Sequence, residues 1–156
     1  MGIESIEAKT LLRKQKQIDS WFLSRFGMNI YRGCSHNCAY CDGRAECYYV
    51  EGEFSRDIKA KTNAATLLRR ELDPARRRKP IPRAYLCLGG GVNDSYQKVE
   101  EQLGLTRQVL EVIAELGYPL HVLTKSTLVE RDYELICRIA EDARAIVSMS
   151  FSTVSD

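Results

Sequence analysis

Strand-like and helix-like patterns alternate along much of this chain, and the alternation restricts the fold more than any other feature. Apolar runs at 84–88, 120–123 and 145–151 are typical of buried strands. Amphipathic helical patterns at 99–116 and 128–143 separate them. Strands that alternate with helices form βαβ units, in which the strands are parallel and the helices cover the sheet. The sequence therefore predicts an α/β fold.

The first half of the chain continues this pattern less regularly. A short extended run occupies 28–31, and 58–62 alternate like a half-buried strand. Asn63 is placed to cap a helix at 64–72. Counted from residue 28, we expect about four βα units in the region 28–156.

The N-terminal residues predict a helix. Between 4 and 26, apolar side chains recur at roughly helical spacing, with basic residues between them. Gly27 follows in the position of a helix stop. We therefore expect residues 1–27 to form a helical extension.

Composition excludes several classes of protein. Hydrophobic residues make up 44% and charged residues 28%, as in soluble domains. No apolar run approaches the roughly 18 residues that a membrane helix needs. The net charge of +2 gives no general attraction to polyanions. Because the N-terminus does not resemble a signal peptide, we expect a cytoplasmic protein with reduced thiols.

Three cysteines, Cys34, Cys38 and Cys41, fall within eight residues in the spacing C-x3-C-x2-C. Thiolates are the usual ligands of iron–sulfur clusters, which typically take four of them. Three thiolates on one loop leave one iron open to another ligand, and an open iron indicates chemistry rather than electron transfer. The triplet therefore predicts an iron–sulfur enzyme.

Other interpretations of the triplet remain open. Cys47, Cys87 or Cys137 could supply a fourth thiolate, although Cys87 lies in an expected strand and Cys137 in an expected helix, where free cysteines pack as small hydrophobes. A zinc site with His36 or Cys47 as the fourth ligand is an alternative, but the chain has no second pair of ligands. A disulfide set is the third.

The triplet, with Tyr40 directly before its last cysteine, resembles the signature of the radical SAM superfamily. The resemblance implies a 4Fe-4S cluster whose open iron binds S-adenosyl-L-methionine. Reductive cleavage of that cofactor then gives a 5′-deoxyadenosyl radical that abstracts hydrogen from a substrate. It also implies a partial (β/α) barrel and a flavodoxin- or ferredoxin-like reductant.

The same resemblance assigns cofactor contacts to residues that follow the expected strands. Ligands of parallel sheets bind beyond the carboxyl ends of the strands. Cofactor-binding residues are thus expected at Tyr40, at the glycine stretch Gly89, Gly90 and Gly91 with nearby Asp94, at Lys125, and at Ser150, with Ser148 on the same face.

Segments 31–44, 93–100 and 123–126 together resemble the spore photoproduct lyase-like branch, whose repair photolyases act on DNA. Those lyases use a cysteine as hydrogen donor. Here Gly91 stands nearest to that position, and Cys87 lies four residues earlier, so no catalytic residue is assigned. DNA is a candidate substrate. A basic group gives it some support: Arg69, Arg70, Arg76, Arg77, Arg78, Lys79 and Arg83.

The last expected strand lies at the end of this sequence, which would leave an open sheet edge. We therefore interpret 28–156 as the N-terminal portion of a radical SAM core, truncated after about four βα units. The alternative functions are a non-catalytic iron–sulfur or zinc protein, and a nucleic-acid-binding module in which the metal only folds the loop.

Overall fold

The computed structural model describes residues 2–18, 20, 22–45, 48, 51–76 and 79–151, and its main feature is a five-stranded sheet. Four neighbouring strands of this sheet are parallel, and only the edge strand β2 is antiparallel to its neighbour. The sheet order is β2 (Leu12–Lys14), β3 (Phe26–Met28), β6 (Leu86–Leu88), β7 (Leu120–Thr124) and β8 (Ala145–Met149). The predicted α/β class is confirmed.

A second sheet has three strands, in the order β1 (Gly2–Ile6), β5 (Asp57–Lys61) and β4 (Tyr31–Arg32). β1 and β5 are parallel, and β4 is antiparallel to β5. The expected strand at 58–62 is thus present, but it belongs to this second sheet. The expected strand at 28–31 is wrong, because the chain divides there between β3 of one sheet and β4 of the other.

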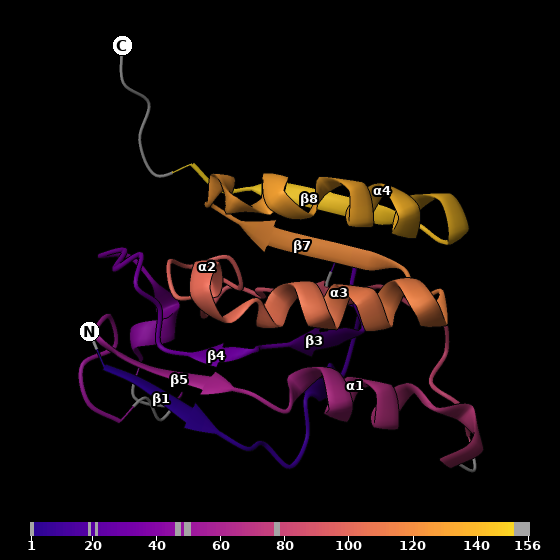
Figure 1. Ribbon diagram of the computed structural model, residues 1–156, viewed down its shortest axis with the longest axis horizontal. Helices are drawn as coiled ribbons and strands as arrows, with labels where there is room; N and C mark the ends of the chain where they lie inside the picture. The colour runs from indigo at the N-terminus through magenta and orange to yellow at the C-terminus, as the bar shows by residue number, and fades with distance from the viewer. Residues whose placement is uncertain are drawn as a thin grey trace.

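The helices form a layer over one face of the strands, in which α1 (Ala64–Leu72), α3 (Leu105–Leu116) and α4 (Tyr133–Asp142) lie side by side (Figure 1). The helix expected at 99–116 is interrupted at Gly104, which has φ of +60° and separates α3 from the short α2 (Glu100–Leu103). The helix expected at 128–143 begins instead as a 3-10 helix, η4 (Thr127–Asp132).

The core lies between the five-stranded sheet and this helical layer. Leu86, Leu88, Leu120 and Val122 alternate along β6 and β7 and are fully buried beneath Val109 and its neighbours on α3. Alternate strand positions point to opposite faces, so the residues between them face away from the helices. The register pairs Gly27, Cys87 and His121 across β3, β6 and β7 on that second face.

The N-terminal helical extension is wrong. Residues 1–27 contribute β1, β2 and part of β3 instead, because backbone pairing with β5 and β6 outweighs the helical spacing. The spaced apolar residues also share no face: Leu11 is buried, whereas Ile18 is 58% and Leu23 is 49% exposed, and Leu23 has φ of +51°. Gly27 lies inside β3 rather than at a helix end.

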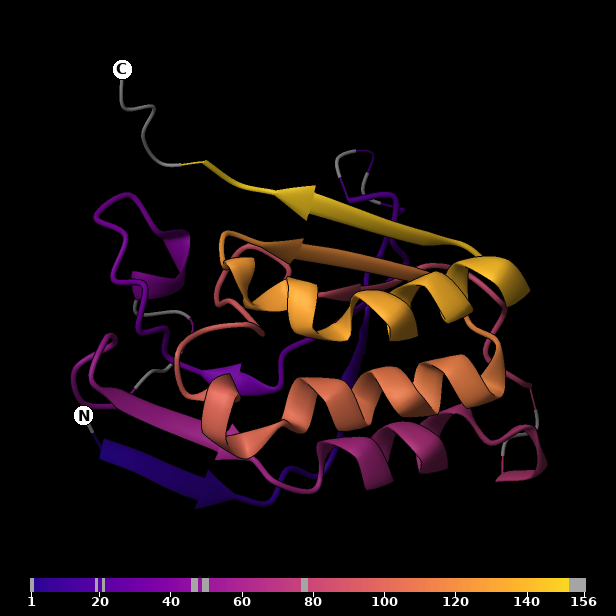
Figure 2. The ribbon, with the colours of Figure 1, turned by 45° about the horizontal axis from the view of Figure 1, so that its top comes forward.

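β6, β7 and β8 all end at the same edge of the sheet. The segment that carries the three cysteines lies beyond their arrowheads, at the left of Figure 2. This arrangement follows from the parallel strand order, and it is the edge at which parallel sheets bind ligands. A search of the described residues finds no helix with the length and apolarity needed to cross a bilayer.

Candidate metal and cofactor site

The cysteine segment is a series of tight turns. The carbonyl oxygens of Cys34, Cys38 and Cys41 each accept a hydrogen bond from the backbone N–H three residues later. The Arg44 guanidinium reaches back to the carbonyl oxygen of Cys38 (3.0 Å) and to the side-chain oxygen of Asn37. These contacts fold the segment into a short loop, and its three cysteines are free thiols.

Cys34 is the most buried of the three cysteines. Burial raises the pKa of its thiol to about 11, against the opposing effect of nearby backbone N–H groups. The thiol is therefore protonated at neutral pH. Because metal ligands must be thiolates, any metal bound here displaces a proton from Cys34.

Gln97 clamps the loop around Cys34. Its side-chain oxygen accepts from Ser35 N (2.9 Å), and its side-chain nitrogen donates to the Gly33 carbonyl oxygen (3.2 Å). The Gln97 side chain is fully buried, so water does not compete for either bond. One amide therefore fixes the backbone on both sides of Cys34.

We expect Gln97→Leu to loosen this loop. The substitution leaves the buried Gly33 carbonyl and the Ser35 N–H without the amide, which costs about 2 kcal/mol of unfolding free energy. Urea denaturation measures that cost, and iron bound per chain after anaerobic reconstitution measures the effect on the cysteines. Gln102→Leu, at an exposed position of α2, is the matched control. Equal stability and equal iron content in both variants would show that the Gln97 amide does not fix the backbone around Cys34.

Asp94 joins three parts of the site. Its carboxylate accepts hydrogen bonds from Tyr96 N (2.8 Å), Thr124 Oγ1 (2.7 Å) and Lys125 N (2.9 Å), and it lies 3.2 Å from His36 Nε2. Both carboxylate oxygens are thus already engaged by the protein. The predicted site residue Asp94 therefore ties the cysteine loop to the end of β7.

The Asp94 contacts make stability depend on pH. Burial opposes ionisation, but the adjacent His36 ring and the hydrogen bonds from Lys125, Tyr96 and Thr124 prevail and hold the pKa of Asp94 below the ordinary value. A lowered folded-state pKa stabilises the fold above the unfolded pKa of about 3.9, and that stability is lost as the pH falls through the folded value.

Asp94→Asn should consequently destabilise the protein by about 2 kcal/mol at neutral pH, and by less as the pH falls below about 4. Urea denaturation of both proteins between neutral and acid pH measures the difference. A difference that stays constant across this range would show that the carboxylate charge is unimportant.

The glycine stretch packs directly against its neighbours. Gly89 has φ of +86°, and a Cβ there would overlap the carbonyl oxygen of Leu123 at the end of β7. Gly91 also has φ of +86°. Gly43, in the cysteine segment, leaves no room for a Cβ against the carbonyl oxygen of Val92. Glycine at 43 and 89 therefore lets the cysteine segment, the glycine stretch and β7 approach at backbone distance.

Lys125 and Ser150 directly follow β7 and β8. Lys125 Nζ donates to Tyr40 OH (2.9 Å) and lies 5.1 Å from the centre of the Tyr40 ring. The hydrogen bond to Tyr40 raises the pKa of Lys125, so the ammonium stays charged. Ser150 N donates to the Thr124 carbonyl oxygen (2.9 Å). Ser148 turns away from this site, and its hydroxyl contacts His121 Nε2 (2.8 Å).

One cavity of about 210 Å³ collects nearly all the predicted site residues. We call it the cysteine cavity. Gly90 is the exception, because it lines a different hollow beside Cys87. A second cavity adjoins the first and shares His36, Cys38, Tyr40, Lys125 and Ser150 with it. The predicted residues that line the cysteine cavity are Cys34, Cys38, Tyr40, Cys41, Gly89, Gly91, Asp94, Lys125 and Ser150.

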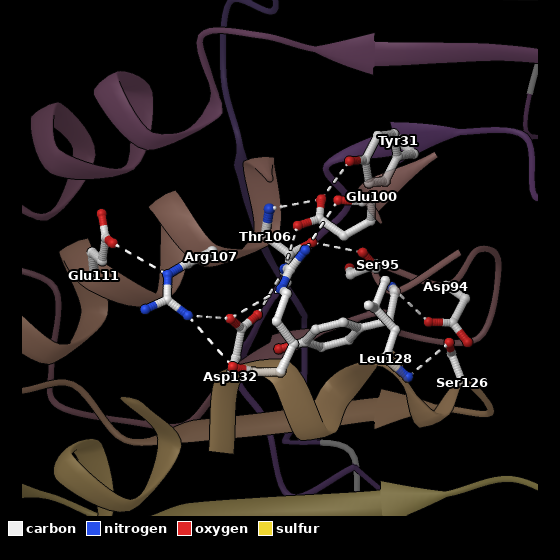
Figure 3. Close-up of polar contacts among 12 residues, drawn as sticks. Tyr31, Asp94, Ser95, Glu100, Thr106, Arg107, Glu111, Ser126, Leu128 and Asp132 are labelled. Atoms are coloured by element: carbon white, nitrogen blue, oxygen red, sulfur yellow. Dashed lines mark hydrogen bonds and ion pairs between the residues drawn. The ribbon is translucent and has the colours of Figure 1, made fainter. Parts of the chain in front are cut away.

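Figure 3 shows a buried ionic network next to this site. Arg131 donates to Glu100 (2.7 Å) and Asp132 (2.8 Å), and Tyr31 OH donates to Glu100 (2.5 Å). Both carboxylates are fully buried. Tyr31 begins β4, which leads into the cysteine segment, and Asp132 ends η4, which follows Lys125. The network therefore fixes two of the segments that flank the cavity.

Several other candidates lie outside the cavity. Cys47 falls outside the described residues, and Cys87 and Cys137 do not line the cysteine cavity. Three arginines of the basic group already have partners within the protein. Arg69 pairs with Glu115, and Arg70 and Arg83 donate to backbone carbonyls. Arg77 and Arg78 fall outside the described residues.

The described residues include no group of three His, Cys, Asp or Glu side chains arranged to hold a metal ion. A single zinc ion draws all its thiolates to about 2.3 Å, which is a compact arrangement. What the site offers is three free thiols that line one cavity from one loop.

Comparison with known proteins finds relatives in bacteria and archaea. The chain is 36% identical over 132 residues to Uncharacterized protein Rv2578c of Mycobacterium tuberculosis and to its counterpart in Mycobacterium bovis, covering 82% of this chain. It is 30% identical over 113 residues to Uncharacterized protein MJ0683 of Methanocaldococcus jannaschii, covering 72%. No family model and no solved structure matches. The chain spans 37% to 39% of the length of these relatives.

Proposed function

We propose that this chain carries the cluster site of a radical SAM enzyme of the lyase-like branch. The observation that carries the proposal is the convergence of four segments, distant in sequence, on the cysteine cavity. These segments are the cysteine loop, the glycine stretch, and the residues after β7 and β8. A thiol-only metal loop that served structure alone would not need the other three segments beside it.

The chemistry of the donor set fits a 4Fe-4S cluster with S-adenosyl-L-methionine. Three thiols supply three of the four ligands that such a cluster takes. The side-chain oxygen of Asn93, which lines the cysteine cavity, is buried without a hydrogen-bond partner and so can accept from a ligand. The charged Lys125 matches a ligand carboxylate.

When bound, this group supplies reductive cleavage of the sulfonium and a radical that abstracts hydrogen. The residues of the chain hold and orient it. Cys34, Cys38 and Cys41 bind the cluster, and Gln97 fixes the backbone around Cys34. Asp94 positions Lys125 N and His36, while the close packing of Gly43 against the Val92 carbonyl holds the cysteine loop beside the end of the glycine stretch.

The proposal extends to the fold and the partners. The parallel strands β3, β6, β7 and β8 correspond to consecutive strands of a partial (β/α) barrel wall. The electron comes from a flavodoxin- or ferredoxin-like reductant. DNA is the candidate substrate of the lyase-like branch, although the cations at Arg69, Arg70 and Arg83 are already engaged within the protein.

Anaerobic reconstitution with iron and sulfide tests the proposal. We expect about four irons and four sulfides per chain, and 5′-deoxyadenosine on addition of dithionite and S-adenosyl-L-methionine. Cys137→Ala, which changes a cysteine on α4, should behave as the parent does. One bound zinc, or a full cluster that leaves S-adenosyl-L-methionine intact, would favour a structural metal loop instead.

A further inference from the structure

Another cavity, of about 430 Å³, is lined in part by Gly33 and Gly43 of the cysteine segment. Arg13, Arg32 and Lys61 line it, and they come from three different strands, β2, β4 and β5. No Asp or Glu among the described residues lines it. We call it the basic cavity.

The three cations of the basic cavity have no carboxylate partner within ion-pair distance in the described part of the chain. Lys59, two residues before Lys61 on the same strand, gives the contrast. It pairs with Glu4 at 3.3 Å and with Glu51 at 2.5 Å. Lys61 Nζ donates instead to the carbonyl oxygen of Asn29 (2.6 Å). Lys59 and Lys61 lie on the same face of β5, yet only the charge of Lys59 is balanced by a carboxylate ion pair among the described residues.

The unbalanced charge is costly to the folded protein. Burial lowers the pKa of Lys61 to about 8, and repulsion from Arg32 and Arg13 adds to the effect, against a smaller opposing attraction from Glu71. A bound anion would relieve that repulsion. Cations that repel one another around a cavity are the arrangement that anion sites use, and arginine donors match the oxygens of a phosphate group.

We propose that the basic cavity binds a phosphate-bearing ligand through Arg13, Arg32 and Lys61. A phosphate group carries more than one negative charge, and so it balances three cations better than a single carboxylate does. The volume exceeds that of one phosphate group and falls in the range of small-molecule sites. The adjoining hollow shares Arg13, Asn29, Tyr48 and Val92 with it and provides about 380 Å³ more.

The position of the basic cavity relates it to the cysteine cavity. Asn93 lines both cavities, and Gly33 and Gly43 of the cysteine segment line the basic cavity. A ligand anchored by its phosphate therefore lies beside the loop that carries the three cysteines. That this ligand is the substrate of the enzyme rests on the proposed function. The binding of phosphate itself does not need the cluster.

Calorimetric titration of the metal-free chain with pyrophosphate tests the site. We expect saturable binding that weakens about tenfold in Lys61→Met and at least as much in the double variant Arg13→Gln with Arg32→Gln. Lys59→Gln, which makes the same change of net charge on the same strand, should weaken binding less than about threefold. Arg13 and Arg32 are exposed, so their replacement keeps the fold even if Lys61→Met does not.

A trinucleotide titrated in the same way separates two sources of phosphate. Tighter binding of pyrophosphate supports a small molecule with a terminal phosphate, and tighter binding of the trinucleotide supports a phosphodiester chain. The proposal is overturned if neither probe binds, or if Lys59→Gln weakens binding as much as the cavity variants do. Because no iron is present, this result is independent of the test for cofactor cleavage.

Discussion

Cys41→Ala is expected to abolish cluster assembly and with it all cleavage of S-adenosyl-L-methionine. Removal of one of three thiolates leaves two, and a cluster held by two protein ligands is not retained. Since changes that touch only the partners of metal ligands cost ten- to a hundredfold in affinity or activity, loss of a ligand itself should exceed about a hundredfold. Iron content and 5′-deoxyadenosine are the measurements.

The control for Cys41→Ala separates loss of the ligand from loss of the fold. Cys41 is only half-buried, and its backbone turn to Arg44 does not depend on the thiol. The circular dichroism spectrum and the urea midpoint of the metal-free variant should therefore match those of the parent. Normal iron content in Cys41→Ala would contradict the assignment and point to a fourth cysteine as ligand.

Gly89→Ala is expected to cost about 3 kcal/mol or more of unfolding free energy, the largest effect on stability that we predict for a single methyl group. Two penalties combine at this position. The φ of +86° is unfavourable for alanine, and the added methyl group overlaps the Leu123 carbonyl oxygen. Relief of that overlap must move the end of β7 away from the glycine stretch, and Lys125 moves with it.

Gly104→Ala is the matched control for Gly89→Ala, and urea denaturation compares them. Gly104 also has positive φ, +60°, but a methyl group there meets no atom within 4 Å. Its cost should be the backbone penalty alone, about 1 to 2 kcal/mol. Gly89→Ala should also weaken cofactor binding, whereas Gly104→Ala should not. Equal costs for the two variants would show that close packing at Gly89 is unimportant.

The patterns that predicted the fold correctly were those with local causes. β6 and β7 are apolar because they are buried, whereas the edge strand β8 has the same pattern although Val147 and Met149 are exposed. The helices α1, α3 and α4 show helical spacing because one face of each is buried. The N-terminal region was predicted wrongly because its helical spacing is accidental. Its structure is set by pairing with β5, more than fifty residues away, which no local pattern records.

Some residues of the candidate site could likewise be predicted from the sequence, and others could not. Lys125 and Ser150 were predictable because each directly follows a parallel strand, where ligands gather. Gln97 was not, because its two bonds join residues 62 and 64 positions apart and nothing in its neighbourhood indicates them. Asn93 was predicted only as part of a segment that resembles the lyase-like branch, and His36 only as an alternative zinc ligand. That both line the cysteine cavity emerges from the folded chain.

The central claim is that Cys34, Cys38 and Cys41 hold a cluster with one iron left open for S-adenosyl-L-methionine. Mössbauer spectroscopy of the anaerobically reconstituted protein, made with isotopically enriched iron, tests it most directly. We expect the addition of S-adenosyl-L-methionine to shift about one quarter of the iron signal, from the single iron without a cysteine. An unchanged spectrum, or a protein that takes up no iron, would contradict it.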